Sequence, residues 1–86
     1  MKYRSRTKII GNILDAANGR ATKTKIMYSA FLSYAQLKEY LSLLTGNNLI
    51  AYLDETQTFK TTEKGLNYLK MHNEIGELLQ TTIKND

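Results

Sequence analysis

The sequence predicts a small, mainly helical α+β domain: three helices, a β-hairpin and a long C-terminal helix, in that order. Three observations predict it. Apolar residues recur at three- and four-residue steps in four separate segments, which is the spacing of a helix face. Residues 49–61 instead show the two-residue alternation of strands around a polar loop. Ser, Thr, Asn or Gly stands where most of these segments begin or end, as expected at helix termini.

The first helix is expected from about Arg4 onward, with Ser5 as its N-cap. The pair Asn18-Gly19 ends it, because both residues accept the left-handed conformation. Its apolar face contains Ile9, Ile10, Ile13, Leu14 and Ala17.

A short second helix follows, capped by Thr22 and carrying a small apolar face of Ile26, Met27 and Ala30. The third helix is expected over residues 33–45. Ser33 and Gln36 have the spacing of a capping box, and Gly46 is expected to stop the helix. Its core-facing residues are Leu37, Leu41 and Leu44, with Tyr40 beside them.

Residues 49–53 and 58–61 form the expected hairpin, and residues 54–57 its loop. Thr62 can cap the last helix, over residues 62–84, whose apolar stripe is Leu66, Leu69, His72, Ile75, Leu79 and Ile83. We therefore expect residues 1–86 to form one domain. Two helices joined by a short turn, with a hairpin beside them, follow the winged helix-turn-helix plan.

Composition argues against most enzyme classes. The 86 residues include no cysteine and one histidine, so we expect no catalytic residues, no metal site and no cofactor. The basic N-terminus lacks the apolar region of a secretory signal, and no segment is apolar enough to span a membrane. A cytoplasmic protein is the default expectation.

The net charge of +4 is unevenly distributed along the chain. Seven basic residues and one acid give the first 25 residues a charge of +6, whereas five basic and seven acidic residues give the remainder −2. A basic front half predicts a polyanionic partner, most commonly nucleic acid. The alternative is a solubilising surface on which the charges cluster by chance.

Four segments carry a resemblance to a known family: "TKTKIMY", "LSYAQLKEYLSLL", "NNLI" and "TTEKG". With them, residues 4–72 resemble the archaeal winged helix-turn-helix proteins regarded as predicted transcriptional regulators or chromatin-associated DNA-binding proteins. The resemblance implies DNA binding, usually as a dimer, which some members form through an extended C-terminal helix. Two features depart from the family pattern. The loop "DETQ" puts Asp54 and Glu55 where carboxylates would repel phosphate, and the turn before the third helix lacks glycine.

The third helix is expected to enter the major groove of double-stranded DNA. The side chains that face away from its core stripe, or flank it, are the candidates for base contacts: Ser33, Tyr34, Gln36, Lys38 and Ser42. Gln36 is equally a capping residue, and Tyr34 can instead pack against residues 25–28 of the second helix. Glu39 is an acid in the middle of this face.

Basic and hydroxyl side chains near the start of the second helix are expected to contact DNA phosphates: Arg20, Thr22, Lys23 and Lys25. Arg4 and Arg6 are expected to extend this phosphate-contacting surface or to act as an N-terminal arm. The last helix is expected to form a homodimer through Leu69, His72, Ile75, Leu79 and Ile83, because a stripe of about four turns usually packs against something. The sequence therefore predicts a DNA-binding transcriptional regulator. The alternative is a winged-helix interaction module that does not contact DNA, and RNA binding is a minor variant.

Overall fold

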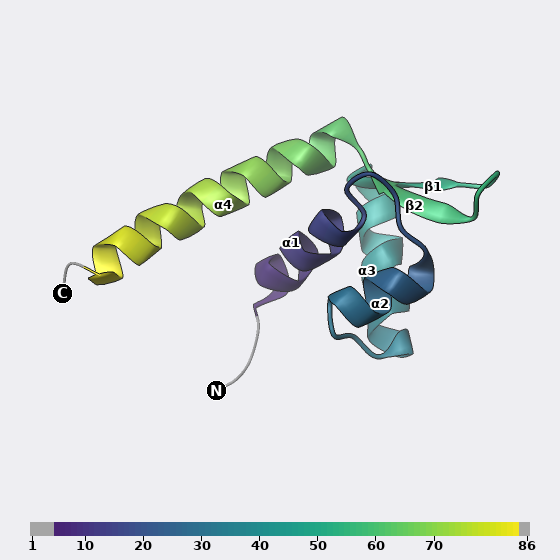
Figure 1. Ribbon diagram of the computed structural model, residues 1–86, viewed down its shortest axis with the longest axis horizontal. Helices are drawn as coiled ribbons and strands as arrows, with labels where there is room; N and C mark the ends of the chain where they lie inside the picture. Colours follow the sequence, from purple (N-terminus) through teal and green to yellow (C-terminus); the bar gives the residue numbers. More distant parts are fainter. Residues whose placement is uncertain (1–4, 85–86) are drawn as a thin grey trace.

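The computed structural model describes residues 5–84, and side chains of residues 5–78. Helices α1 (Arg6–Ala16), α2 (Lys23–Ser29) and α3 (Tyr34–Gly46) precede strands β1 (Ile50–Leu53) and β2 (Thr58–Thr61), and helix α4 (Glu63–Lys84) follows (Figure 1). Helices α1 to α3 pack together, the hairpin extends from one side of them, and α4 runs past α1 in the opposite direction. The predicted α+β, mainly helical winged-helix architecture is confirmed.

The core lies between α1, α2, α3 and the first residue of β1. Its largest fully buried side chains are Ile13, Leu14, Ile26, Leu37, Leu44 and Ile50. The apolar faces predicted for the first three helices are therefore confirmed, with Ile10, Met27 and Tyr40 half-buried at the edge of the core.

Each helix begins at the hydroxyl residue that the sequence indicates. The Ser5 and Thr22 hydroxyls accept hydrogen bonds from the Lys8 and Lys25 amides at 3.2 and 3.1 Å. The Thr62 hydroxyl accepts one from the Gly65 amide at 3.1 Å. These bonds satisfy amide donors that a helix N-terminus leaves without a partner.

The end of α3 differs slightly from the prediction. Gly46 is the last helical residue, Asn47 is the C-cap, and Asn48 takes the left-handed conformation with φ of 62°. Asparagine tolerates this conformation better than most residues, which explains why the glycine is not used for it. At the end of α1, Gly19 does adopt a positive φ of 93°.

The hairpin is extended by a bridge that the sequence does not reveal. Strands β1 and β2 are antiparallel, with Tyr52 opposite Phe59 and their ring centroids 4.9 Å apart. The Ala21 and Phe59 backbones exchange two hydrogen bonds, with N···O distances of 2.9 and 2.8 Å. The segment between α1 and α2 is thereby fixed to the wing, which holds the start of α2 beside β2.

The turn between α2 and α3 has no glycine, and Phe31 takes the left-handed conformation there, with φ of 55°. The Leu32 amide donates to the Met27 carbonyl at 3.0 Å, and Leu32 and Ala30 are buried. The chain thus reverses between two buried side chains and turns the Phe31 side chain outward.

Helix α4 extends well beyond the other elements. It makes the molecule elongated, with principal extents of 49 × 28 × 19 Å. At its start, the Thr62 hydroxyl donates to the Asn48 carbonyl at 2.7 Å and the Lys64 ammonium donates to the Asn47 carbonyl at 2.9 Å. These bonds anchor the first turn of α4 to the end of α3, while the C-terminal half of α4 projects away (Figure 1).

Candidate nucleic-acid interface

Helix α3 turns a broad, mainly polar face to solvent, on which Ala35 and Leu43 are also exposed. Ser33, Tyr34, Gln36, Lys38 and Ser42 are all exposed, whereas Leu37, Leu41 and Leu44 are buried on the opposite face. Tyr34 is 55% exposed although it is a large aromatic residue. The five candidates for base contacts therefore share one accessible helix face, together with the exposed Glu39.

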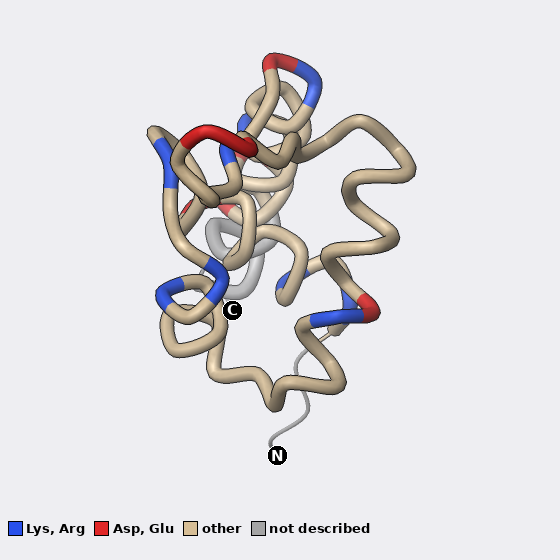
Figure 2. The backbone as a smooth tube through the Cα atoms, turned by 90° about the vertical axis from the view of Figure 1, so that its right-hand side faces the viewer, with Lys and Arg blue, Asp and Glu red and all other residues tan. Residues whose placement is uncertain are grey.

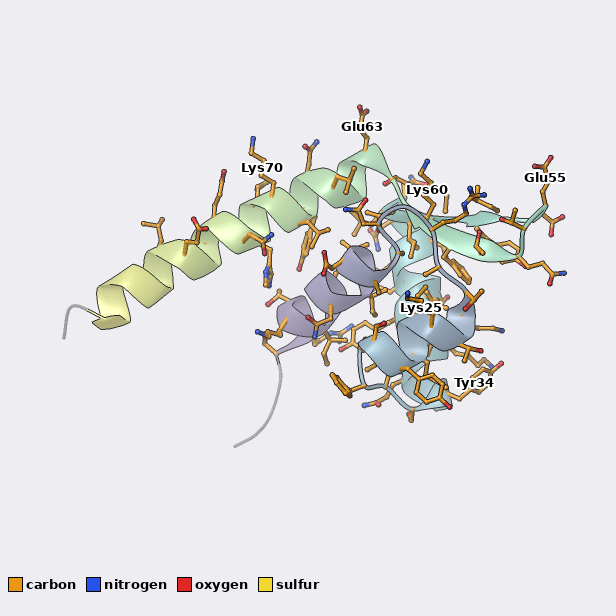
Figure 3. The ribbon with its side chains drawn as sticks, in the orientation of Figure 1. Lys25, Tyr34, Glu55, Lys60, Glu63 and Lys70 are labelled. Atoms are coloured by element: carbon orange, nitrogen blue, oxygen red, sulfur yellow. The ribbon has the colours of Figure 1, made fainter. Side chains whose placement is uncertain are left out.

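The Tyr34 ring makes cation–π contacts with a lysine of α2 and a lysine of α3. The Lys23 ammonium of α2 lies 5.6 Å from the centroid of the Tyr34 ring, and the Lys38 ammonium of α3 lies 5.7 Å from it. An exposed cation over an aromatic ring contributes about 0.5–1 kcal/mol. Figure 3 shows Tyr34 at the end of α3 where it meets α2, on the side away from the wing. A predicted phosphate contact and two predicted base contacts thus form one cluster.

Ser33 and Gln36 are occupied with starting the helix. The Gln36 side-chain oxygen accepts a hydrogen bond from the Ser33 amide at 3.0 Å, and the Ser33 hydroxyl accepts one from the Gln36 amide at 3.2 Å. This reciprocal pair is the predicted capping box. Of the five candidates for base contacts, Tyr34, Lys38 and Ser42 make no such capping bond.

The candidates for phosphate contacts divide into two places. Thr22, Lys23 and Lys25 are exposed at the start of α2, and Arg20 is exposed just before it. Arg6 lies elsewhere: its guanidinium is 5.7 Å from the Tyr40 ring, and it lines a cavity of about 100 Å³ with Tyr40 and Glu39. Arg4 lies outside the described residues.

A groove of about 850 Å³ connects the start of α2, the outer face of α3 and the wing. The sequence analysis named Thr22, Lys23 and Ser42 as candidate contacts, and all three line this groove. It did not identify Thr24 of α2 or the groove residues that the wing contributes. Tyr52 and Phe59 reach it because of the strand register, which no local pattern specifies. Its lining is Thr22, Lys23, Thr24, Leu41, Ser42, Thr45, Tyr52, Gln57 and Phe59.

Charge is distributed in a way that separates this surface from the wing tip. Residues 16–38 contain four basic residues and no acid. Asp54 and Glu55 are exposed at the tip, and Figure 3 shows Glu55 at the far end of the wing. Figure 2 shows red at that tip and blue on α2. An anionic ligand would therefore be attracted to the α2 and α3 side of the groove and repelled by the tip.

The stripe on α4 meets α1 for part of its length. Leu69 packs against the core, and the His72 ring lies against Gly11 of α1, where an added Cβ would be 3.5 Å from the ring. The His72 Nδ1 atom is buried, and none of the described residues offers it a hydrogen-bond partner. Ile75 is 56% exposed. The structure describes the backbone of Leu79 and Ile83 but not their side chains.

A largely apolar groove of about 420 Å³ follows α1 and α4. It is lined by Ser5, Thr7, Lys8, Tyr68, Met71, His72, Ile75 and Gly76. Partial burial raises the pKa of the Tyr68 phenol, whose hydroxyl donates a long hydrogen bond of 3.5 Å to the Thr7 carbonyl.

Within residues 5–84, no three His, Cys, Asp or Glu side chains are grouped as metal ligands would be. Among the described helices, none has both the length and the apolar character needed to cross a bilayer.

Comparison with known proteins identifies a solved structure with a similar fold and a matching protein family. A crystal structure of Sso10a-2, a DNA-binding protein from Sulfolobus solfataricus, superposes with a TM-score of 0.85. The two are 20% identical, and the match covers 95% of this chain and 88% of the other. No curated protein matches the sequence. The model of the family described as "Winged helix-turn-helix" matches residues 3–80, so this protein belongs to the winged helix-turn-helix family.

Proposed function

We propose that this protein binds double-stranded DNA through α3 and regulates transcription. The observation that carries the proposal is the exposed polar face of α3, which the lysines of α2 border. The 23 residues 16–38, which include α2 and the start of α3, contain no acidic residue. The fold likeness to a protein described as DNA-binding supports the proposal.

In the proposed complex, α3 enters the major groove. Lys38 and Ser42 approach base edges, since lysine suits guanine acceptors and a hydroxyl can contact either kind of base pair. Lys23, Lys25 and Arg20 lie along the phosphates, as the first helix of a helix-turn-helix crosses the backbone. Tyr34 lies between the two sets, with the Lys23 ammonium on its phosphate side and the Lys38 ammonium on its base side.

A salt titration of duplex binding tests this proposal. The logarithm of the association constant should fall linearly with the logarithm of salt concentration, with a slope of about −0.9 for each phosphate contact. The Lys23→Ala and Lys25→Ala double variant should have a slope less negative by about 1.8. Lys70→Ala is the matched control, because Lys70 points away from this surface on α4 (Figure 3). An affinity that does not change with salt would contradict DNA binding.

A protein-interaction module without DNA contact is the second candidate. The exposed Glu39 within the α3 face and the acidic tip of the wing favour it, because both repel phosphate. If neither the wild type nor a Lys23, Lys25, Lys38 triple alanine variant retains duplex DNA, that result supports the interaction module.

We also propose that the protein is a homodimer through α4. Met71, Ile75 and Leu78 are exposed on this helix, and the groove along α1 and α4 continues the same apolar surface. A second α4, with Leu79 and Ile83 among its contacts, would bury that surface. His72 lies at the edge of the surface, and Leu69 begins it.

Solution mass tests the dimer. The wild type should have twice the chain mass of 9.8 kDa, and Ile75→Lys should shift it to the single-chain mass, because a charge would enter an apolar contact. Asn73→Lys adds the same charge at a neighbouring exposed position and should leave the dimer intact. A single-chain mass for the wild type at high concentration contradicts the proposal.

A further inference from the structure

Three exposed aromatic residues follow one another along the connection from α2 to α3. Tyr28, Phe31 and Tyr34 are 70%, 81% and 55% exposed. Consecutive members are three residues apart, so their Cα atoms lie within about 10 Å of each other. We call Tyr28, Phe31 and Tyr34 the aromatic arc. Of the described aromatic side chains, only Tyr52 is comparably exposed outside it.

The turn between α2 and α3 holds Phe31 in a conformation that presents its ring to solvent. Its φ of 55° is unfavourable for a bulky residue and would be accessible without strain to glycine. A ring that is 81% exposed recovers little of this cost through burial. Strained backbone of this kind is concentrated at functional sites, where the surrounding structure maintains it.

The charge around the arc specifies the ligand class. The ammoniums of Lys23 and Lys38 stand at the Tyr34 ring, and the surrounding residues 16–38 contain no acid. Cations beside exposed aromatic faces suit a chain of phosphates that carries unpaired bases, since each base can stack on a ring while its phosphate meets an ammonium. The bases of a duplex already stack on one another, so their faces are not available to the arc.

We propose that the aromatic arc is a binding site for single-stranded nucleic acid, with bases stacked on Phe31 and its two tyrosine neighbours. This site uses the turn before α3 and does not require Lys38 or Ser42 to enter a major groove. Single-stranded binding can therefore fail while duplex binding succeeds, and the reverse is equally possible.

A single tryptophan reports stacking directly, because the chain contains no tryptophan of its own. In Phe31→Trp, addition of oligodeoxythymidylate of about 12 nucleotides should quench the fluorescence, as bases stack on the indole. Lys70→Trp places the same fluorophore at an exposed position on α4 that points away from the arc (Figure 3), and it should show no quenching. Oligouridylate of the same length distinguishes the sources: quenching by both oligomers indicates shared recognition of bases and phosphates, and quenching by one identifies DNA or RNA as the ligand.

Phe31→Gly separates binding from folding. Glycine adopts the left-handed conformation without strain, so the melting temperature should equal or exceed that of the wild type. The affinity for oligodeoxythymidylate should fall about tenfold, which is the usual effect of removing one stacking side chain. The affinity for duplex DNA should change less than twofold.

Four results would overturn the proposal. The first three are a wild type that does not bind either oligomer at low salt, a Phe31→Trp variant that is not quenched by either oligomer, and a Phe31→Gly variant whose single-strand affinity is unchanged. An equal loss of duplex and single-strand affinity in Phe31→Gly would also overturn it, because the arc would then belong to the duplex interface.

Discussion

Gly65 lies where the first turn of α4 passes the end of α3. A Cβ added to it would overlap the Leu49 carbonyl oxygen and approach the Thr61 Cγ2 atom to 2.6 Å. The Thr62 amide also donates to the Leu49 carbonyl, at 3.1 Å, so the backbone cannot easily move away. The absence of a side chain at this residue therefore allows α4 to begin directly after the wing.

We predict that Gly65→Ala lowers the free energy of unfolding by about 1–3 kcal/mol, as overpacking in a closed site usually does. Urea denaturation measures this change. Gly46→Ala, at the last residue of α3, is the control, because among the described residues no atom beyond its chain neighbours and its own helix backbone lies within 4 Å of an added Cβ. Its replacement should leave the protein unchanged or stabilise it by up to about 1 kcal/mol through helix propensity. Equal effects at the two glycines would show that the close approach at Gly65 is unimportant.

The residue scale also shows where sequence reasoning was limited. Asparagine and glycine at the ends of α1 and α3 were recognised as turn residues because their chemistry favours that role. Nothing in its residue type marks Phe31 as left-handed, and the sequence indicated only that the turn before α3 lacks glycine. Buried Ala30 and Leu32 on either side impose the conformation.

At the scale of elements, α3 depends on its own first turn. Ser33 and Gln36 satisfy each other's amides, and the three leucines then follow at core positions. Both features are local, so the sequence predicted the N-cap of this helix to the residue. The same locality explains the agreement at Ser5, Thr22 and Thr62.

We predict that Ser33→Ala lowers the free energy of unfolding by about 0.5–2 kcal/mol, because the Gln36 amide loses its acceptor. Ser42→Ala, on the exposed middle of the same helix, should change it by less than about 0.5 kcal/mol. Thermal or urea denaturation compares the two. If Ser33→Ala is as stable as the wild type but binds duplex DNA less tightly, Ser33 is a base contact and its capping role is minor.

At the scale of the whole molecule, Thr61 connects α1 to the wing. It is only 3% exposed, its hydroxyl donates to the Leu14 carbonyl at 2.6 Å, and its amide donates to the Ala17 carbonyl at 3.1 Å. These two bonds and the Ala21–Phe59 bridge hold the wing against the helices. The groove that faces α3 depends on this attachment.

Replacing Thr61 by valine keeps the shape of the side chain and removes the buried hydroxyl. We predict a loss of about 1–2 kcal/mol in the free energy of unfolding, since a buried hydrogen bond is removed. Thr56→Val, at the exposed tip of the wing, should change the free energy by less than about 0.5 kcal/mol. A Thr61→Val variant as stable as Thr56→Val would mean that the hydroxyl does not hold α1 to the wing.

The sequence by itself determined the order of the elements, their caps, the core faces of the first three helices and the unequal distribution of charge. Each of these follows from the spacing of neighbouring residues along the chain, and local spacing is what side-chain periodicity and helix capping depend on. Only the tertiary structure decided that Ala21 pairs with Phe59, that His72 covers Gly11, and that Tyr34 stands between Lys23 and Lys38. Except for the contact between Tyr34 and Lys38 within α3, these contacts join different elements. Local patterns in the sequence therefore do not predict them.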